Sequence, residues 1–188
     1  MRVQNATLKG VSMDRVKRAR DIMIPIGEYP YISKNNTLFE AMEKFEESEL
    51  ATGGRKSLPR ALLVFDDNNE LMGIVRRRDI LRGLEPDFLT SKSLDYRKKL
   101  FDVKVDPNLS ELSFEALVQG VKKQSGNEVM DIIIPIYETV DHEDHLGKII
   151  YEMVDNNVSL LPVLKDGSVV GVVRSVDVFN ELYKVMRG

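Results

Sequence analysis

Apolar residues recur along this chain with the spacing of helices and of strands, and each pattern occurs twice. The spacing i, i+3, i+4 and i+7 of a half-buried helix is found in two stripes: Leu38, Ala41, Met42 and Phe45 in the first, and Leu146, Ile149, Ile150, Met153 and Val154 in the second. Asn36 and Asp144 precede the two stripes and are residue types that favour the N-cap position. We therefore predict two helices, each burying its apolar stripe in a core.

Each stripe is followed by two short apolar runs with a polar turn between them, the pattern of a β-hairpin. The runs are residues 61–65 and 71–75 in the first copy, and 160–164 and 169–173 in the second. Both second runs lead into a Gly-x-Val-Arg-x-x-Asp segment, at 73–79 and 171–177. A closing helix is predicted after each, with apolar positions Ile80, Leu81 and Leu84 in one and Val178, Phe179 and Leu182 in the other.

The two copies also open on almost the same six residues, DIMIPI at 21–26 and DIIIPI at 131–136. These openings lie 110 positions apart (131 − 21), whereas the Gly-x-Val-Arg segments lie 98 apart (171 − 73). The first copy therefore contains about twelve extra residues, which we assign to a loop insertion near 48–59. Each copy reads as β-α-β-β-α and, at roughly 60 residues, is too small to bury its own core well. We predict an α/β (α+β) fold in which the two copies pack through their sheets with pseudo-two-fold symmetry.

The predicted boundaries follow from these matches. Residues 1–18 form an N-terminal arm, 19–84 the first copy, 85–127 a connecting arm and 128–188 the second copy. The connecting arm is polar but has a helical pattern at 112–121, which begins at Ser110 or Ser113. The pattern predicts one helix in the arm and gives it no role.

Composition excludes several classes of function. The net charge is −3, so no overall positive field favours nucleic acid, and Arg76, Arg77 and Arg78 are interpreted as a solvated helix start. The chain has no cysteine, which excludes disulfides and thiolate metal sites. It also lacks an apolar stretch long enough for a signal peptide or a membrane span. We expect a cytoplasmic protein without nucleic-acid or membrane partners.

Taken in order and present twice, these segments resemble CBS domains, the domains named after cystathionine β-synthase. The resemblance is carried by the opening Asp-Ile-x-Ile-Pro segments, the Leu-Leu-Pro-Val run at 160–163, and the two Gly-[Ile/Val]-Val-x-x-x-Asp endings. It implies a tandem pair, or Bateman module, with clefts between the repeats that bind adenosine-containing ligands such as AMP, ATP or S-adenosylmethionine. It further implies a homodimer with a regulatory role and no required cofactor.

The resemblance also assigns candidate binding residues. By resemblance, Asp79 and Asp177 accept hydrogen bonds from the ribose hydroxyls. Adenine needs an apolar slot, and the predicted wall residues are Ile24, Pro25, Ile134, Pro135, Leu63 and Pro162. Where the family commonly has Thr or Ser three residues before the Asp, this chain has Arg76 and Arg174. A guanidinium binds phosphate through two parallel hydrogen bonds, so both arginines are predicted phosphate ligands.

Other interpretations stay open at this stage. Asp79 and Asp177 favour a helix start with or without a ligand, and Arg76 and Arg174 are long enough to fill the clefts. The second hypothesis is therefore a ligand-free dimerisation or interaction module, whereas the regulatory module of the first hypothesis acts through an unknown effector protein.

The stretch 140–145 contains His142, His145 and three carboxylates, which suggests a metal site or a hydrolase; a solvated helix-entry loop explains it more simply. Since no Walker loop, Gly-x-Ser-x-Gly elbow or GxGxxG motif is present, we expect a protein that is not an enzyme.

Overall fold

The computed structural model describes residues 17–52, 55–86 and 113–187. Residues 1–16 of the predicted N-terminal arm, the centre of the predicted insertion and residues 87–112 of the predicted connecting arm lie outside this description. The chain divides into two compact units. One consists of Met1–Glu28 and Tyr137–Gly188, and the other of Tyr29–Ile136.

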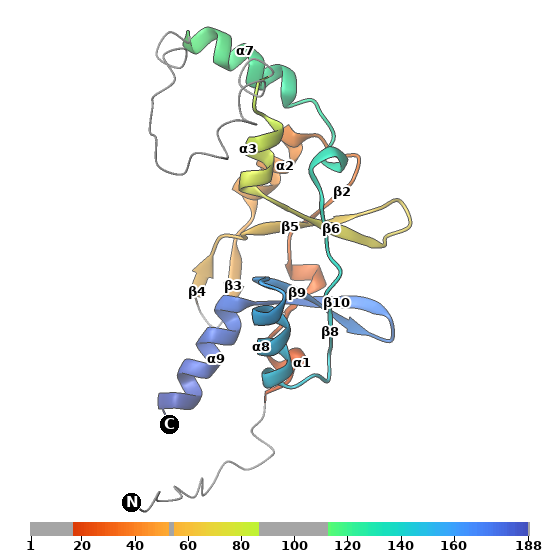
Figure 1. Ribbon diagram of the computed structural model, residues 1–188, viewed down its shortest axis with the longest axis vertical. Coiled ribbons are helices and arrows are strands. Elements are labelled where there is room, and N and C mark those ends of the chain that lie inside the picture. The colour runs from red at the N-terminus through yellow and green to blue at the C-terminus, as the bar shows by residue number, and fades with distance from the viewer. Residues whose placement is uncertain (1–16, 53–54, 87–112, 188) are drawn as a thin grey trace, which may run out of the picture. The chain divides into compact units, whose positions relative to one another are not determined.

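The unit Tyr29–Ile136, called the first-repeat unit below, contains most of the first copy (Figure 1). Its elements are β2 (Tyr31–Ser33), α2 (Leu38–Glu47), β3 (Leu50–Thr52), β4 (Arg55–Ser57), β5 (Ala61–Phe65), β6 (Leu71–Arg76), α3 (Arg77–Gly83), α7 (Phe114–Gln124), the 3₁₀ helix η3 (Val129–Ile132) and β7 (Ile134–Pro135). Four strands form a sheet in the order β2-β5-β6-β7, and β3 and β4 form a separate hairpin. Strand β2 runs parallel to β5, and the other neighbours in the sheet are antiparallel.

The other unit, called the second-repeat unit below, repeats this plan. Its elements are α1 (Ala19–Ile22), β1 (Ile24–Pro25), the 3₁₀ helix η2 (Ile26–Glu28), β8 (Val140–Asp141), α8 (Leu146–Asp155), β9 (Leu160–Lys165), β10 (Ser168–Arg174) and α9 (Ser175–Arg187). The sheet order is β1-β10-β9-β8, with β8 parallel to β9. In Figure 1, α8 and α9 lie on one face of this sheet.

The opening strands are exchanged between the copies. Strand β1 precedes the first copy but pairs with β10, so that Ile24 lies opposite Val172; β7 precedes the second copy but pairs with β6, so that Ile134 lies opposite Ile74. Each opening strand therefore completes the sheet of the other copy. Both are edge strands, where a proline interrupts no further ladder.

Glycine makes this exchange possible at both places. A Cβ atom at Gly171 would lie 2.6 Å from the carbonyl oxygen of Ile24, and one at Gly73 would overlap the carbonyl oxygen of Ile134. Because only a residue without a side chain allows this close approach, the Gly of each Gly-x-Val-Arg segment is required by the edge strand.

Each unit has its own hydrophobic core between its sheet and helices. In the first-repeat unit the most deeply buried members include Phe45, Leu38, Leu62, Val64 and Val129. In the second-repeat unit they include Ile149, Leu161, Val163, Val173 and Val140. Burial on this scale supplies the main stabilising free energy of each unit.

Several local predictions need correction. The segments between the opening residues of each copy and its first long helix, which the sequence pattern left without regular structure, contain the strands β2 and β8. The N-cap of α2 is Thr37, whose hydroxyl accepts a hydrogen bond from the backbone N–H of Glu40, and the N-cap of α8 is His145; neither Asn36 nor Asp144 occupies that position. Threonine and asparagine can both accept a hydrogen bond from a backbone N–H of the first helical turn, so the sequence alone did not distinguish Asn36 from Thr37 as the N-cap of α2.

The burial of the helical stripes was also predicted too broadly. Met42 and Val154 are exposed, and so are Leu81 and Phe179 in the closing helices. These four positions lie at the margins of their stripes, where the helix surface turns from the core toward solvent.

The insertion and the connecting arm both contain regular structure. Residues 50–52 and 55–57 pair as the antiparallel strands β3 and β4, in which Leu50 lies opposite Ser57, so the extra residues are not simply a loop. In the arm, α7 begins after Ser113, whose hydroxyl accepts a hydrogen bond from the backbone N–H of Ala116. Val121 of α7 packs against the core of the first-repeat unit. Ser110 and residue 112 lie outside the described residues.

Candidate functional site

An arginine and an aspartate form a two-pronged ion pair at the strand-to-helix junction of each unit. In the second-repeat unit, Arg174 donates from Nε to Asp177 Oδ2 at 2.7 Å and from Nη2 to Oδ1 at 2.8 Å. In the first-repeat unit, Arg76 donates from Nε to Asp79 Oδ2 at 2.7 Å and from Nη2 to Oδ1 at 3.1 Å. The predicted ribose acceptor and the predicted phosphate ligand are thus bonded to each other in both repeats.

The local sequence explains this geometry. The arginine ends a strand, the helix begins at the next residue, and the aspartate is the third residue of the helix. At this position a side chain can reach back to the last strand residue, and Asp79 accepts a hydrogen bond from the backbone N–H of Arg76 at 3.1 Å. Each carboxylate also lies in the first helical turn, where negative charge is favoured. The helix-start role proposed for the two aspartates is therefore present alongside the ion pair.

Four of the six apolar residues predicted to hold adenine lie in a row across their sheet. The other two, Pro25 and Pro135, lie beside these rows, opposite Gly171 and Gly73. In the first-repeat unit, Leu63 pairs with Ile74, and Ile74 pairs with Ile134. In the second-repeat unit, the corresponding row is Pro162, Val172 and Ile24. None of the six residues that form these two rows belongs to the described core cluster of its unit. Because side chains alternate along a strand and the neighbours in sequence do face the core, each row lies on the sheet face opposite the helices.

The same face of each sheet carries the arginine. Arg174 pairs with Leu160, two residues from Pro162 along β9, and Arg76 pairs with Ala61, two residues from Leu63 along β5. Residues two apart on a strand point to the same side. Strand exchange therefore sorts the predicted site residues into two sets: Ile134, Pro135, Leu63, Arg76 and Asp79 in the first-repeat unit, and Ile24, Pro25, Pro162, Arg174 and Asp177 in the second-repeat unit. Each set offers an apolar row, a guanidinium and a carboxylate.

One charged residue near this set was not among the predicted site residues. Arg78 Nε lies 3.9 Å from Asp79 Oδ1, so Asp79 has a second cation beside it. The run Arg76-Arg77-Arg78 carried this signal in the sequence but was interpreted as solvated. Arg78 is indeed exposed, but Arg77 is not simply solvated, since its guanidinium lies over the Phe45 ring and donates to the carbonyl oxygen of Pro59.

The paired state defines what the arrangement can do chemically. A guanidinium bound to a carboxylate is the geometry that also binds phosphate, so an incoming phosphate competes with the aspartate for the arginine. Once released, the aspartate has both oxygens available to accept hydroxyl groups. The arrangement is suited to reversible binding of a ligand that carries both a phosphate and a diol.

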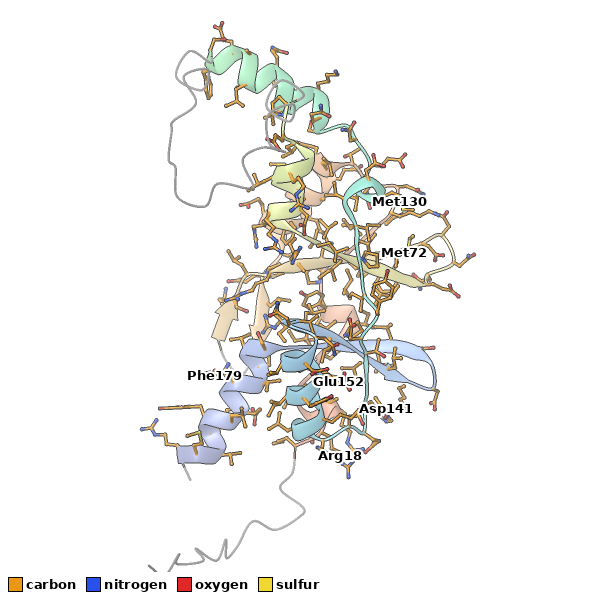
Figure 2. The ribbon with its side chains drawn as sticks, in the orientation of Figure 1. Arg18, Met72, Met130, Asp141, Glu152 and Phe179 are labelled. Atoms are coloured by element: carbon orange, nitrogen blue, oxygen red, sulfur yellow. The ribbon has the colours of Figure 1, made fainter. Side chains whose placement is uncertain are left out.

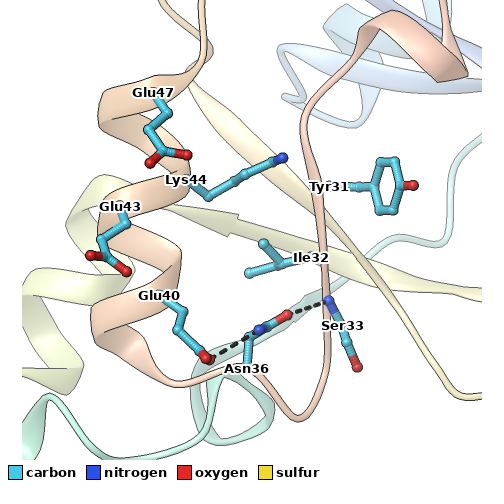
Figure 3. A pocket seen from close by; sticks show the side chains of 8 residues that line it. All are labelled: Tyr31, Ile32, Ser33, Asn36, Glu40, Glu43, Lys44 and Glu47. Carbon is cyan, nitrogen blue, oxygen red and sulfur yellow. Dashed lines mark hydrogen bonds between the residues drawn. The ribbon is translucent and has the colours of Figure 1, made fainter.

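A separate pocket of about 350 Å³ lies between β2 and α2 in the first-repeat unit (Figure 3). Its lining includes Glu40, Glu43, Glu47 and Lys44, and none of the predicted site residues. Hydrogen bonds from the Asn36 side chain and the Thr37 backbone lower the pKa of Glu40, so this carboxylate is charged at neutral pH. Three carboxylates beside a single lysine disfavour an anionic ligand, and the pocket is therefore a poor nucleotide site.

The stretch 140–145 forms the entry to α8 (Figure 2). His142 Nδ1 lies 3.2 Å from Asp141 Oδ1, and its Nε2 lies 3.3 Å from Glu143 Oε1. Arg18 and Arg20 form ion pairs with the Glu143 carboxylate. His145 caps α8 through Nδ1, which accepts from the backbone N–H of Lys148. Within residues 17–52, 55–86 and 113–187, no group of three or more metal-ligating side chains is positioned to hold a metal ion.

The helices in the part of the chain that the structure describes include none with both the length and the apolar character needed to cross a membrane.

The chain has the fold of solved CBS-domain proteins. A CBS-domain protein of unknown function from Kribbella flavida matches with a TM-score of 0.63 and 15% sequence identity over 89% of this chain and 98% of that one. CBSX2 from Arabidopsis thaliana matches with a TM-score of 0.59 and 20% identity over 91% and 97% of the two chains. The complex of CBSX2 with AMP matches with a TM-score of 0.56 and 19% identity over 90% and 98%. A comparison with curated proteins finds no match.

The model of the CBS-domain family matches two stretches of this sequence, residues 19–86 and 129–184. Together they cover well over half of the chain, and they coincide with the two copies of the β-α-β-β-α pattern. The predicted mixed α/β fold with two repeats is confirmed. The chain belongs to the CBS-domain family and carries two CBS domains in tandem.

Proposed function

We propose that this protein is a regulatory module that binds an adenosine-containing nucleotide, of the AMP, ATP or S-adenosylmethionine class, in the cleft expected between its two CBS repeats. Its role in this proposal is to sense the ligand and pass the change to an effector protein, not to catalyse a reaction. No other cofactor is required. Coupling arises if the ligand binds one arrangement of the chain better than another.

One observation supports the proposal above the others: each unit combines an apolar row with an arginine and an aspartate on neighbouring positions. The row suits the adenine ring, and the aspartate suits the ribose hydroxyls. Arg76 and Arg174 suit a phosphate group better than the hydroxyl commonly found there, because a guanidinium donates two parallel hydrogen bonds. The similar protein CBSX2 has been solved in complex with AMP, which is in line with this ligand class.

The first experiment is thermal unfolding with each ligand. A ligand that binds the folded state raises the melting temperature as its concentration exceeds its Kd. We expect at least one of AMP, ATP and S-adenosylmethionine to do so at millimolar concentration, and Asp79→Ala to weaken the response. Glu43→Ala serves as the control because it removes a carboxylate from the same unit at the acidic pocket instead. No response to any of the three ligands would contradict the proposal.

Mass spectrometry of small molecules released from the purified, denatured protein tests the ligand class without a prior choice. An adenosine-containing compound in stoichiometric amount supports the proposal. A compound of a different class, found in stoichiometric amount, would contradict the proposed ligand class.

A second candidate function is a ligand-free dimerisation module. It is favoured by the closed Arg76–Asp79 and Arg174–Asp177 pairs, which already satisfy one another. It is also favoured by exposed apolar residues on the helices of the second-repeat unit, Tyr151 and Val154 on α8 and Phe179 and Tyr183 on α9. Under this alternative, nucleotides leave the mass and the melting temperature of the dimer unchanged.

A further inference from the structure

The two Arg–Asp pairs are built differently, and we propose that only the pair of the first repeat opens to bind a nucleotide phosphate through Arg76, with Arg78 neutralising Asp79 in its place. The pair of the second repeat stays closed and is structural. This inference rests on the proposed function and deepens it, because it specifies a phosphate-bearing nucleotide and one binding site per chain.

The first difference is exposure. The Arg76 side chain is 33% exposed, whereas the Arg174 side chain is 8% exposed. Their aspartate partners are both buried. A phosphate in solution therefore has access to the Arg76 guanidinium, and Arg76 leaves its partner without crossing a buried region. Opening the Arg174 pair exposes a guanidinium that is almost fully enclosed.

The second difference is what each aspartate retains when its arginine leaves. Asp79 keeps the hydrogen bond from the Arg76 backbone N–H and the nearby charge of Arg78, whose Nε is 3.9 Å away. The hydrogen bonds described for Asp177 both come from the Arg174 side chain. The residue that corresponds to Arg78 in the second repeat is Val176, which carries no charge. A buried carboxylate that loses its cation is costly, and Arg78 lowers this cost in the first repeat alone.

Binding in the first repeat is then an exchange of partners. The nucleotide phosphate replaces Asp79 on Arg76. Asp79 keeps its backbone hydrogen bond and accepts the ribose hydroxyls through the lone pairs that Arg76 vacates, while Arg78 remains beside it. The number of ion pairs is the same before and after the exchange, because Arg76 gains the phosphate as it loses Asp79. Binding therefore leaves no buried charge without a partner, and the free energy of binding is not reduced by that cost. In the second repeat the same exchange leaves Asp177 without a cation.

The test exchanges the residue that differs between the repeats. Arg78→Val and Val176→Arg both change exposed side chains, so both variants are expected to fold. ATP binding to the full chain is measured by equilibrium dialysis. We expect one ATP per chain in the wild type, about fivefold weaker binding in Arg78→Val, and a second ATP in Val176→Arg. Unchanged affinity in Arg78→Val, or unchanged stoichiometry in Val176→Arg, overturns the role of this position.

A second readout follows the two arginines directly. The Nε–H signals of Arg76 and Arg174 are assigned by NMR and followed while ATP is added. We expect the chemical shift of the Arg76 signal to change with added ATP and that of the Arg174 signal to stay constant. A change at Arg174 without one at Arg76 overturns the inference. Two equivalent ATP sites, or binding of S-adenosylmethionine without ATP, overturns it while leaving the proposed function standing. If none of ATP, AMP and S-adenosylmethionine binds, both the inference and the proposed function are contradicted.

Discussion

Arg174 and Asp177 form the most buried ion pair described in this chain, with side chains 8% and 4% exposed. Burying two charges costs solvation free energy, and the two aligned hydrogen bonds offset that cost. The pair therefore adds little net stability while it is intact, but removing one partner leaves the other charge buried. Arg76 and Asp79 have the same geometry, and there the arginine reaches water. The two pairs should therefore respond differently to truncation.

We expect Asp177→Ala to lower the free energy of unfolding by about 3 kcal/mol, because Arg174 loses two charge-assisted hydrogen bonds in an enclosed position. Asp79→Ala should cost less, since Arg76 can be hydrated in place. Urea unfolding of both variants measures the difference. The double variant Arg174→Met/Asp177→Leu is the control, because replacing both charges with apolar groups should recover much of the loss. Equal losses for Asp79→Ala and Asp177→Ala would show that exposure does not distinguish the pairs.

Among the structural elements, the exchanged edge strands β1 and β7 do most to assemble the candidate site. Each has only two residues, yet each delivers an isoleucine and a proline to the sheet of the other copy. The apolar row of each unit is complete only with this strand. The exchange depends on Gly73 and Gly171, whose missing side chains let the edge strand approach.

Gly171→Ala is expected to destabilise the second-repeat unit by about 1–3 kcal/mol, because the new methyl group would lie 2.6 Å from the Ile24 carbonyl oxygen, which is closer than van der Waals contact, and would force β1 away. Thermal or urea unfolding measures the loss. Gly27→Ala is a matched control in the same N-terminal segment, since nothing lies within 4 Å of a Cβ atom there. Equal stability of the two variants would argue against close packing of β1 on β10.

At the level of the whole chain, the remaining question is association. Phe179 on α9 is 68% exposed, and Leu81 occupies the corresponding position of α3 with the same exposure. Large apolar side chains gathered on exposed helices are typical of protein–protein contacts. The family resemblance predicts a homodimer, and these helix surfaces are the candidates for its interface.

If α9 forms the dimer interface, Phe179→Glu/Tyr183→Glu should convert the dimer to a monomer, because two carboxylates would be buried without partners. Light scattering coupled to size-exclusion chromatography gives the mass. Leu58→Glu, a change at an equally exposed apolar residue near the β3–β4 hairpin, is the control and should leave the dimer intact. A monomeric wild type, or a dimer that survives the double substitution, would rule out this interface.

The repeat was predictable from the sequence because its signals are local. Helix spacing, hairpin alternation and the strand-to-helix endings involve residues close together in the chain, and each occurs twice. The two CBS domains and the hairpin of residues 61–65 and 71–75 therefore followed without tertiary information. The residue types at Arg76, Asp79, Arg174 and Asp177 were visible in the same way. The short strands β2 and β8 were missed, since two or three residues carry too little periodicity.

The sequence by itself determined the family, the doubling and the residue types of the candidate site. Only the tertiary structure decided which residues share a unit, because exchange of the edge strands joins Ile24 to Val172, 148 positions on (172 − 24), and Ile134 to Ile74, 60 positions back (134 − 74). It also decided that each arginine is bonded to its own aspartate, and that Arg78 lies beside only one of these pairs. Burial and partner choice depend on how the chain packs in three dimensions, and two similar local motifs acquire different environments for that reason.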